Sequence, residues 1–486
     1  MCLPSVVVLD PCFGSILSWD LQYNLKEFGL SPMISHRIPH QAGLSLLISP
    51  TRCRKALQEA KAISKDGLGA FASSQGMAFD EYSVVTSDRW KLKIHRVRSP
   101  DVYNSTLSTP VLISHGLTCS SADFMMNPRS ESLAFILADN GFDVFLVNHR
   151  GNQFSYEKVS KSGLAYPAKG EDIYESAWQF MSQYDIPAAL DFILKETGHD
   201  KIHLVAHSQG NPVILGFLGS DHSYDDKVGH FAALSPVVIL GDDLGPTVKL
   251  FLRAFAPIVE KLPTFLFKIV TQARILTSAQ TFGNRFIYPF CDFLPGVCQL
   301  TVNWILQRDL IDFFTLSPEF DKGRTTVLKA VWPGGVTGMN TYELSSQIYM
   351  KQEAWTRIDY RKIPQSGITN QEMYNREDPP EFKFDEARVN SSYIFAKNDV
   401  FLGLKSAQRI VDWLKPMNQL IVDEERFSHV DFLWSWRAAC LVYNFVVEQF
   451  VESDVARSAP HAQYRRVVAE HLKSLESPRC SYMDSL

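Results

Sequence analysis

The sequence predicts an α/β fold, in which a mostly parallel central sheet is flanked by helices and is interrupted by a largely helical insertion. Apolar runs of strand length alternate with helical stretches such as 132–140 and 186–196. This alternation is typical of right-handed β-α-β crossovers, which place helices on both faces of a parallel sheet. The strands expected from it are 110–114, 142–148, 202–206 and 230–234, and the same rhythm resumes with 393–396 and 419–422.

An antiparallel hairpin is expected to begin the folded core. Residues 81–86 and 91–97 alternate between polar and apolar side chains on either side of a turn. The residues before the hairpin are irregular, apart from a helical stretch near 54–64. We therefore expect an N-terminal extension over 1–65 and the first part of the core over 66–240.

A long interruption then separates the two parts of the core. Residues 241–386 are rich in Phe and Pro and contain amphipathic pieces such as 248–255. We expect a helical cap, or lid, over the carboxyl ends of the strands, where open α/β sheets hold their sites. A separate helical domain is the alternative. The core is expected to resume over 387–452, with a last helix from about 432 to 451, before a polar tail over 453–486.

Composition excludes several classes of protein. The chain has 486 residues, 45% of them hydrophobic, and a formal net charge of -5, so it is long and apolar enough for a large core. It has no basic stripe of the kind that binds nucleic acid. Its eight cysteines show no zinc-binding spacing. Cys291 and Cys298 lie close together, and the sequence leaves open whether they form a disulfide or remain reduced thiols.

The sequence also gives expectations about membranes and compartment. No basic segment followed by a sustained apolar run marks a secretory signal at the N-terminus. The apolar stretch 286–307 contains Pro289, Asp292 and Pro295, so we expect it to be buried or interfacial rather than membrane-spanning. These observations predict a cytoplasmic protein, or one attached peripherally to a membrane or a lipid droplet.

A strand-to-helix turn around Ser208 is the most informative local pattern. The apolar run 201–206 ends in a small-x-Ser-x-small turn, with Ala206 and Gly210 as the small residues and His207 before the serine. A serine at the crest of so sharp a turn presents its hydroxyl above the sheet, as the nucleophile of acyl transfer does. Short matches of this kind also occur by chance, so a plain strand-to-helix turn is the alternative.

Two residues further along the chain complete a nucleophilic triad in the order Ser, Asp, His. Asp399 follows the expected strand 393–396, in a loop where a carboxylate can face the serine. The alternative is an Asp that caps a helix or a turn. His429 lies beyond the last strand, just before the last helix. A serine hydroxyl is a weak nucleophile, so it needs a histidine base and an acid that orients this base.

The loop after the strand 110–114 is expected to complete an oxyanion hole. It reads His115-Gly116-Leu117, and Gly116 allows close approach of the backbone. We predict that the backbone N–H groups of Leu117 and Gln209 donate to the oxyanion. Cys119 is nearby, but nothing in the sequence would lower its pKa, so we interpret it as a packing residue.

With these motifs in place, the chain resembles the acid lipase family, which includes gastric lipase, lysosomal acid lipase and fungal steryl ester hydrolases. The similarity runs from about residue 76 to 450 and is weakest in the cap. The segments that carry it are 115–117, 133–144, 148–152, 184–188, 206–210 and 428–434.

The resemblance implies an α/β-hydrolase fold, a triad of Ser208, Asp399 and His429, and a lid over the site. It also implies hydrolysis of triacylglycerols or cholesteryl and other steryl esters. Relatives carry cap cysteines in the region of Cys291 and Cys298, and are secreted or lysosomal. The chain departs from the family at Ala206, where glycine is usual.

These observations predict a serine-dependent lipase or esterase that acts through an acyl-enzyme, without a metal or other cofactor. Its expected partners are a neutral-lipid ester and a lipid surface or droplet, contacted through cap aromatics such as Phe265 and Phe267. Packing of these aromatics between cap and core is the alternative. Two other functions remain open: hydrolysis of small esters or thioesters on the same fold, and catalytically inactive lipid binding.

Overall fold

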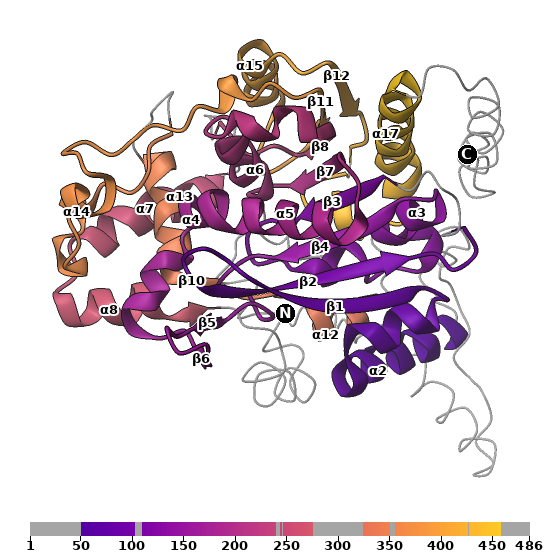
Figure 1. The fold of residues 1–486 in the computed structure, drawn as a ribbon, viewed down its shortest axis with the longest axis horizontal. Coiled ribbons are helices and arrows are strands. Elements are labelled where there is room, and N and C mark those ends of the chain that lie inside the picture. The colour runs from indigo at the N-terminus through magenta and orange to yellow at the C-terminus, as the bar shows by residue number, and fades with distance from the viewer. Residues whose placement is uncertain are drawn as a thin grey trace, which may run out of the picture.

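The computed structural model describes residues 50–102, 109–239, 244, 246–275, 324–349, 355–425 and 427–457. Within these residues a ten-stranded sheet forms the centre of the molecule (Figure 1). Its strands, in chain order, are β1 (Ala78–Val85), β2 (Trp90–Arg98), β3 (Pro110–Ser114), β4 (Asp143–Asn148), β5 (Glu157–Val159), β6 (Ala165–Pro167), β7 (Ile202–His207), β8 (Val228–Leu234), β11 (Ser391–Ala396) and β12 (Asn418–Val422).

The order of the strands confirms the predicted α/β fold. Neighbours follow the order β12-β11-β8-β7-β3-β4-β2, and β2 also pairs with β1 and with the β5-β6 hairpin. The strands from β12 to β4 are parallel, whereas β2 is antiparallel to β4 and to β1. The predicted hairpin at the start of the core is therefore confirmed.

Helices cover both faces of the sheet, because side chains of each strand alternate between two apolar layers. On one face, residues such as Val205 pack with α2 (Pro50–Ser74), α3 (Leu133–Asp139) and α17 (Asn444–Arg457). On the other face, residues such as Leu204 pack with α5 (Ile186–Thr197), α6 (Gly210–Leu218) and α15 (Leu404–Leu414).

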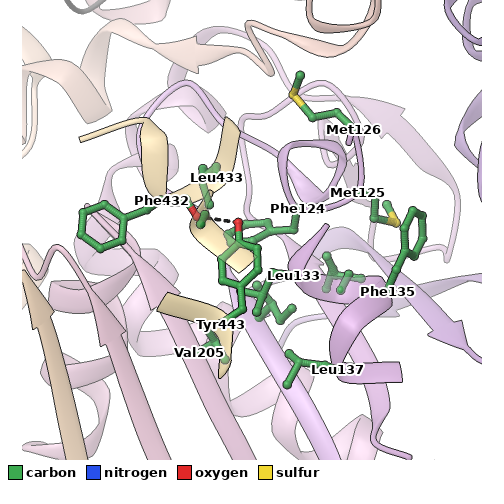
Figure 2. Packing of buried hydrophobic residues seen from close by; sticks show 14 of the residues in the cluster. Phe124, Met125, Met126, Leu133, Phe135, Leu137, Val205, Phe432, Leu433 and Tyr443 are labelled. Carbon is green, nitrogen blue, oxygen red and sulfur yellow. Dashed lines mark hydrogen bonds between the residues drawn. The ribbon is translucent and has the colours of Figure 1, made fainter. Parts of the chain in front are cut away.

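The packing on the first face is shown in Figure 2, where Leu133, Leu137 and Phe124 lie around the ring of Tyr443. The Tyr443 hydroxyl donates to the carbonyl oxygen of Phe432 at 2.7 Å. This bond satisfies the polar end of a ring that is otherwise surrounded by apolar side chains. It also fixes the chain just after the segment that carries His429.

The described part of the insertion is mainly helical. Tyr342, Phe267 and Val259 belong to a buried cluster that joins its helices to Tyr174 and Phe180 of the core. The elements of the insertion are α7 (Pro246–Glu260), α8 (Thr264–Gln272), α12 (Thr325–Val331), α13 (Gly338–Tyr349), α14 (Asn370–Tyr374) and the short antiparallel pair β9 (Arg274–Ile275) and β10 (Val336–Thr337). Helices α7, α8, α13 and α14 lie toward one end of the molecule, whereas α12 lies beside α2 (Figure 1).

Short helical turns complete the described structure. The three-residue α4 (Trp178–Phe180) leads through a π turn (Met181–Asp185) into α5, and α16 (Asp431–Trp434) precedes a second π turn (Ala439–Tyr443). The 3-10 turns are Ser121–Phe124, Arg129–Glu131, Gly170–Ser176, His222–Lys227, Tyr360–Lys362, Pro364–Ser366 and Phe384–Glu386.

Several predicted boundaries differ from the elements of the structure. Helix α2 continues through residue 65 with a kink at Gly67, because Ile63 and Phe71 are both buried in the same layer. The helix predicted over 432–451 is instead broken after α16 at Ser435. Helix α17 extends past residue 452, where Asp454 accepts a hydrogen bond from His203 Nε2 at 3.0 Å.

The end of the insertion is packed into the core. Phe382 and Phe384 belong to the apolar layer that contains α6 and α15, although they precede the predicted boundary at residue 386. On α6, a Cβ added to Gly216 would lie 2.9 Å from the Phe382 ring and 2.9 Å from Ser182 Oγ. The absence of a side chain at Gly216 therefore allows the returning chain to rest directly on α6.

Among the described residues, no helix has the length and apolar character needed to cross a membrane. The same residues hold no group of three or more His, Cys, Asp or Glu side chains arranged to bind a metal ion. Cys291 and Cys298 lie outside the described residues, so the choice between a disulfide and two reduced thiols stays open.

Candidate active site

Ser208 lies in a tight turn between β7 and α6, at the carboxyl ends of the parallel strands, here called the carboxyl edge of the sheet. Its φ is +54°, a left-handed conformation that costs a residue with a side chain about 1–3 kcal/mol. The turn is held by bonds from Ser208 N to Leu234 O at 3.1 Å and from Asn211 Nδ2 to Ser208 O at 3.0 Å. The surrounding fold thus maintains a strained turn that leaves the Ser208 side chain half-buried.

The small residues of this turn do not have equal roles. A Cβ on Gly210 would lie 2.6 Å from the backbone oxygen of Ser114, so glycine is required there. Ala206 lies at the end of β7, beside Ser114 on β3 and Ala233 on β8, and its methyl group is buried in the apolar layer. An alanine is therefore accommodated at the first small position.

His429 and Asp399 reach Ser208 from two other loops at the carboxyl edge. His429 Nε2 lies 2.7 Å from Ser208 Oγ, and His429 Nδ1 lies 2.9 Å from Asp399 Oδ2. Because Nδ1 faces a carboxylate, it carries the ring hydrogen, and Nε2 is left to accept the hydroxyl hydrogen of Ser208. This geometry has the hydrogen-bond order of a serine, a base and an orienting acid.

The charge of Asp399 is stabilised despite burial. Burial alone raises the pKa of this carboxyl, but His429 and hydrogen bonds from Ser235 and the backbone N–H of Phe401 hold the pKa below its usual value. The N–H of Leu402 also donates to Asp399 Oδ1, at 3.1 Å. Asp399 is therefore an anion over the neutral pH range.

Ser235 is a site residue that the sequence prediction missed. It follows β8, has a φ of +43° and is fully buried. Its hydroxyl lies 2.6 Å from Asp399 Oδ2 and 3.0 Å from His429 Nδ1. The signal in the sequence was a serine directly after a parallel strand, on the same edge as Ser208, but Ser-Pro after a strand is also an ordinary turn.

One backbone donor, the N–H of Leu117, lies in the loop after β3, and another, the N–H of Gln209, lies in the turn directly after Ser208. Neither the N–H of Leu117 nor that of Gln209 donates a hydrogen bond to another of the residues described by the structure. Gly116 has a steric reason to be glycine, because an added Cβ would lie 2.9 Å from Ser208 Cβ and 3.2 Å from the backbone oxygen of His207. The loop therefore passes directly against the turn that carries Ser208.

The side chain of His115 fixes this loop through hydrogen bonds. Its Nδ1 donates to Gly116 O at 2.8 Å, while its Nε2 accepts from His149 N and from Asn152 Nδ2, both at 3.1 Å. Burial, together with the neighbouring His149, lowers the pKa of His115 to about 3. The ring therefore stays neutral, with one tautomer that matches its three partners.

His207 serves the neighbouring loop in a similar way. Its Nε2 donates to the backbone oxygen of His429 at 2.9 Å. Burial and the nearby His429 lower the pKa of His207 to about 3, so it is a neutral donor that anchors His429 rather than a base toward Ser208. Cys119 is also buried, and burial raises the pKa of its thiol, as expected for a packing residue.

Family comparisons match the first half of the core. The model described as alpha/beta hydrolase fold matches residues 109–279, and that described as partial alpha/beta-hydrolase lipase region matches residues 69–128.

Curated relatives match over most of the chain. Gastric triacylglycerol lipase of Rattus norvegicus is 29% identical over 387 residues, which cover 78% of this chain and 89% of the relative. Lipase 3 of Drosophila melanogaster is 27% identical, and the match covers 78% of this chain and 92% of the relative. A putative lysosomal acid lipase/cholesteryl ester hydrolase of Crotalus adamanteus is 26% identical, covering 77% and 88%.

Solved structures are similar at lower identity. A putative lipase from Sulfolobus solfataricus has a TM-score of 0.47 at 12% identity, and the match covers 78% of this chain and 95% of that chain. A putative aryl esterase from Burkholderia cenocepacia has a TM-score of 0.40 at 14% identity, with 78% and 100% covered.

Proposed function

Because the chain is an α/β-hydrolase of the acid lipase family, we propose that it hydrolyses neutral-lipid esters, triacylglycerols or steryl esters, through an acyl-enzyme on Ser208. The observation that carries the proposal is the 2.7 Å contact between Ser208 Oγ and His429 Nε2, with Asp399 on the other ring nitrogen. Gastric triacylglycerol lipase among the relatives supports the substrate class.

The proposed reaction proceeds in two steps. His429 Nε2 accepts the Ser208 proton as Oγ attacks the ester carbonyl, and the N–H groups of Leu117 and Gln209 stabilise the negative oxygen. His429 then gives the proton to the departing alcohol, which leaves an acyl-enzyme. Water, deprotonated by His429, attacks this ester and releases the fatty acid, while Asp399 keeps the hydrogen on Nδ1.

The proposed lipid contact is the outer face of α7 and α8. Leu250, Phe265 and Ile269 on these helices are exposed by 70%, 73% and 52%, respectively. Lys268 on α8 is also exposed, and a cation beside apolar side chains suits the boundary between lipid and water. In contrast, Phe267 is buried in the cluster that joins cap and core, which fits the packing alternative.

We further propose that residues 241–386 act as the lid of the site, and that the protein works at a lipid–water interface. A cytoplasmic droplet or membrane surface would provide this interface. So would a lysosomal or secreted lipid particle, and the name of the Crotalus relative favours the lysosome. Localisation of the tagged full chain in cells, with droplet and lysosome markers, tests these two locations.

The full-length protein and a Ser208→Ala variant provide the test. Fatty-acid release from trioleoylglycerol, cholesteryl oleate and p-nitrophenyl butyrate is measured at pH 5 and pH 7. We expect the intact chain to release fatty acid from at least one long-chain lipid, and Ser208→Ala to lose about a millionfold in kcat, as nucleophile removal does in a well-studied serine hydrolase.

Two outcomes would contradict the proposal. Activity limited to p-nitrophenyl butyrate would indicate a hydrolase of small esters. A folded chain that neither hydrolyses any ester nor reacts with a fluorophosphonate probe at Ser208 would indicate lipid binding without catalysis.

A further inference from the structure

Ser235, like Ser208, directly follows a strand of the sheet and has a positive φ. Strand β8 lies between β7, which leads to Ser208, and β11, which leads to Asp399. Ser235 directly follows β8 with a φ of +43°, and its N–H donates to Ile394 O of β11 at 2.8 Å. A left-handed non-glycine residue that is also buried at a reactive site points to a constrained position.

The hydroxyl of Ser235 contacts both members of the acid–base pair. Its oxygen lies 2.6 Å from Asp399 Oδ2 and 3.0 Å from His429 Nδ1. Because Nδ1 carries a hydrogen toward the carboxylate, the hydroxyl hydrogen goes to Oδ2, and a lone pair of Ser235 faces the Nδ1–H. The hydroxyl therefore completes a three-membered set of hydrogen bonds with these two groups.

The two oxygens of Asp399 are held by different groups. Oδ1 accepts from the backbone N–H groups of Phe401 and Leu402, at 2.8 and 3.1 Å. Oδ2 accepts from Ser235, and His429 Nδ1 lies within 3.0 Å of both oxygens. Without the Ser235 hydroxyl, Oδ2 would depend on His429 alone among these donors, and the orientation of the carboxylate would be less constrained.

We propose that Ser235 is a positioning residue, whose hydroxyl fixes Asp399 Oδ2 and thereby holds His429 in the orientation that accepts the Ser208 proton. Ser235 does not contact the reacting atoms; it acts through Asp399 and His429. The inference rests on the proposed esterase function, since it concerns the efficiency of the same base.

The test compares Ser235→Ala and Ser235→Gly with the intact chain on p-nitrophenyl butyrate. Both variants remove the hydroxyl, whereas glycine also removes the cost of a positive φ. We expect kcat to fall by about 10- to 100-fold in both, the range set by one lost charge-assisted hydrogen bond, with KM unchanged. Should the alanine variant fail to fold, the glycine variant carries the same test.

A matched control removes another buried serine hydroxyl of the sheet. Ser392 on β11 contacts His230 Nε2 at 2.8 Å and Gln449 Oε1 at 3.0 Å. Ser392→Ala should lower the melting temperature without changing kcat. A merely structural role of Ser235 would give the same result as this control.

A double mutant shows whether Ser235 acts through Asp399. In an Asp399→Ala background, Ser235→Ala should cause no further loss of kcat, because the group that it positions is gone. Unchanged kcat in both single variants, or an equal loss with and without Asp399, would overturn the inference. Failure of the esterase proposal itself looks different, since the intact chain would then show neither turnover nor fluorophosphonate labelling.

Discussion

Asp399 at the carboxyl edge of the sheet and Glu343 on cap helix α13 are both buried carboxyl groups, but their pKa values shift in opposite directions. Asp399 accepts hydrogen bonds from His429, Ser235 and two backbone N–H groups, and its pKa lies below the usual value. Glu343 accepts from the backbone N–H of Gln179 at 3.1 Å, while its Oε1 has no hydrogen-bond partner among the described residues. Burial raises the pKa of Glu343 to about 8.

Burial raises the pKa of both carboxyls, but at Asp399 it is outweighed by His429 and by hydrogen-bond donors, whereas at Glu343 it is not. The fold supplies four donors where an anion is needed to orient a base. On α13 it supplies fewer, and Glu343 is mostly protonated at neutral pH. The carboxyl edge thus stabilises the charged form of Asp399, whereas the surroundings of α13 favour the neutral form of Glu343.

The largest expected effect comes from removing the charge at the carboxyl edge. Asp399→Asn should lower kcat on a soluble ester by about ten-thousandfold, because an amide does not stabilise the imidazolium or the required tautomer of His429. Steady-state kinetics measures the loss, and circular dichroism checks the fold. A loss of less than tenfold would show that the charge of Asp399 is not needed.

The second effect concerns the backbone donors at the same edge. Gly116→Ala places a methyl group 2.9 Å from Ser208 Cβ and should displace the loop with its Leu117 N–H. Loss of one oxyanion donor predicts a kcat about 10²- to 10³-fold lower. Leu117→Ala, which keeps the N–H, is the control and should retain kcat; an equal loss in both variants would contradict the assignment.

On the cap side of the comparison, Glu343→Gln should change how stability depends on pH. The folded-state pKa of about 8 lies above the ordinary value of 4.5, so between these values the folded state binds more protons than the unfolded state. The free energy of unfolding of the intact chain should therefore fall as pH rises from about 4.5 to 8. Glutamine does not titrate, so over the same pH range the free energy of unfolding of the variant should fall less than that of the intact chain, by on the order of a few kcal/mol.

Urea unfolding at pH 5, 6.5 and 8 measures this difference. The buried histidines His115 and His207, with pKa values lowered to about 3, act in the opposite sense, because their protonation in the unfolded state destabilises the fold as pH falls below about 6.5. They are present in both proteins and cancel in the comparison. If the free energy of unfolding depends on pH in the same way in both proteins, the pKa of Glu343 is not raised in the folded state.

The smallest expected effect is on lipid binding by the outer face of the cap. The double variant Phe265→Ser/Ile269→Ser should bind a trioleoylglycerol emulsion about tenfold more weakly, since two exposed apolar side chains no longer enter the lipid. Activity on p-nitrophenyl butyrate should not change. Leu164→Ser, which alters a core side chain that is 70% exposed, is the control and should bind normally.

Much of the candidate site was predictable because parallel strands bring their carboxyl ends to one edge. The runs that end before Ser208 and Asp399 have clear strand patterns, and His429 follows the last of them. Topology then places these residues together, whatever their separation along the chain. Gly116 and Gly210 were likewise readable as close backbone approaches, and an added Cβ at either position meets neighbouring atoms.

Other features depend on packing that the sequence does not encode locally. The helix predicted near 54–64 is followed, across a kink at Gly67, by a further helical stretch of α2, whose Phe71 is buried on the sheet. Nothing in the pattern around Glu343 indicates that its carboxyl is buried. Ser235 is followed by a proline, and only the three-dimensional neighbourhood of Asp399 gives its hydroxyl a partner.

The close approach of Phe382 to Gly216 links the end of the insertion to helix α6. The helix that starts two residues after Ser208 is the surface on which the polypeptide rests as it leaves the insertion and rejoins the sheet. A substitution that displaces Phe382 would therefore also disturb the helix that follows Ser208. The position of Ser208 and the return of the chain to the sheet thereby depend on the same glycine.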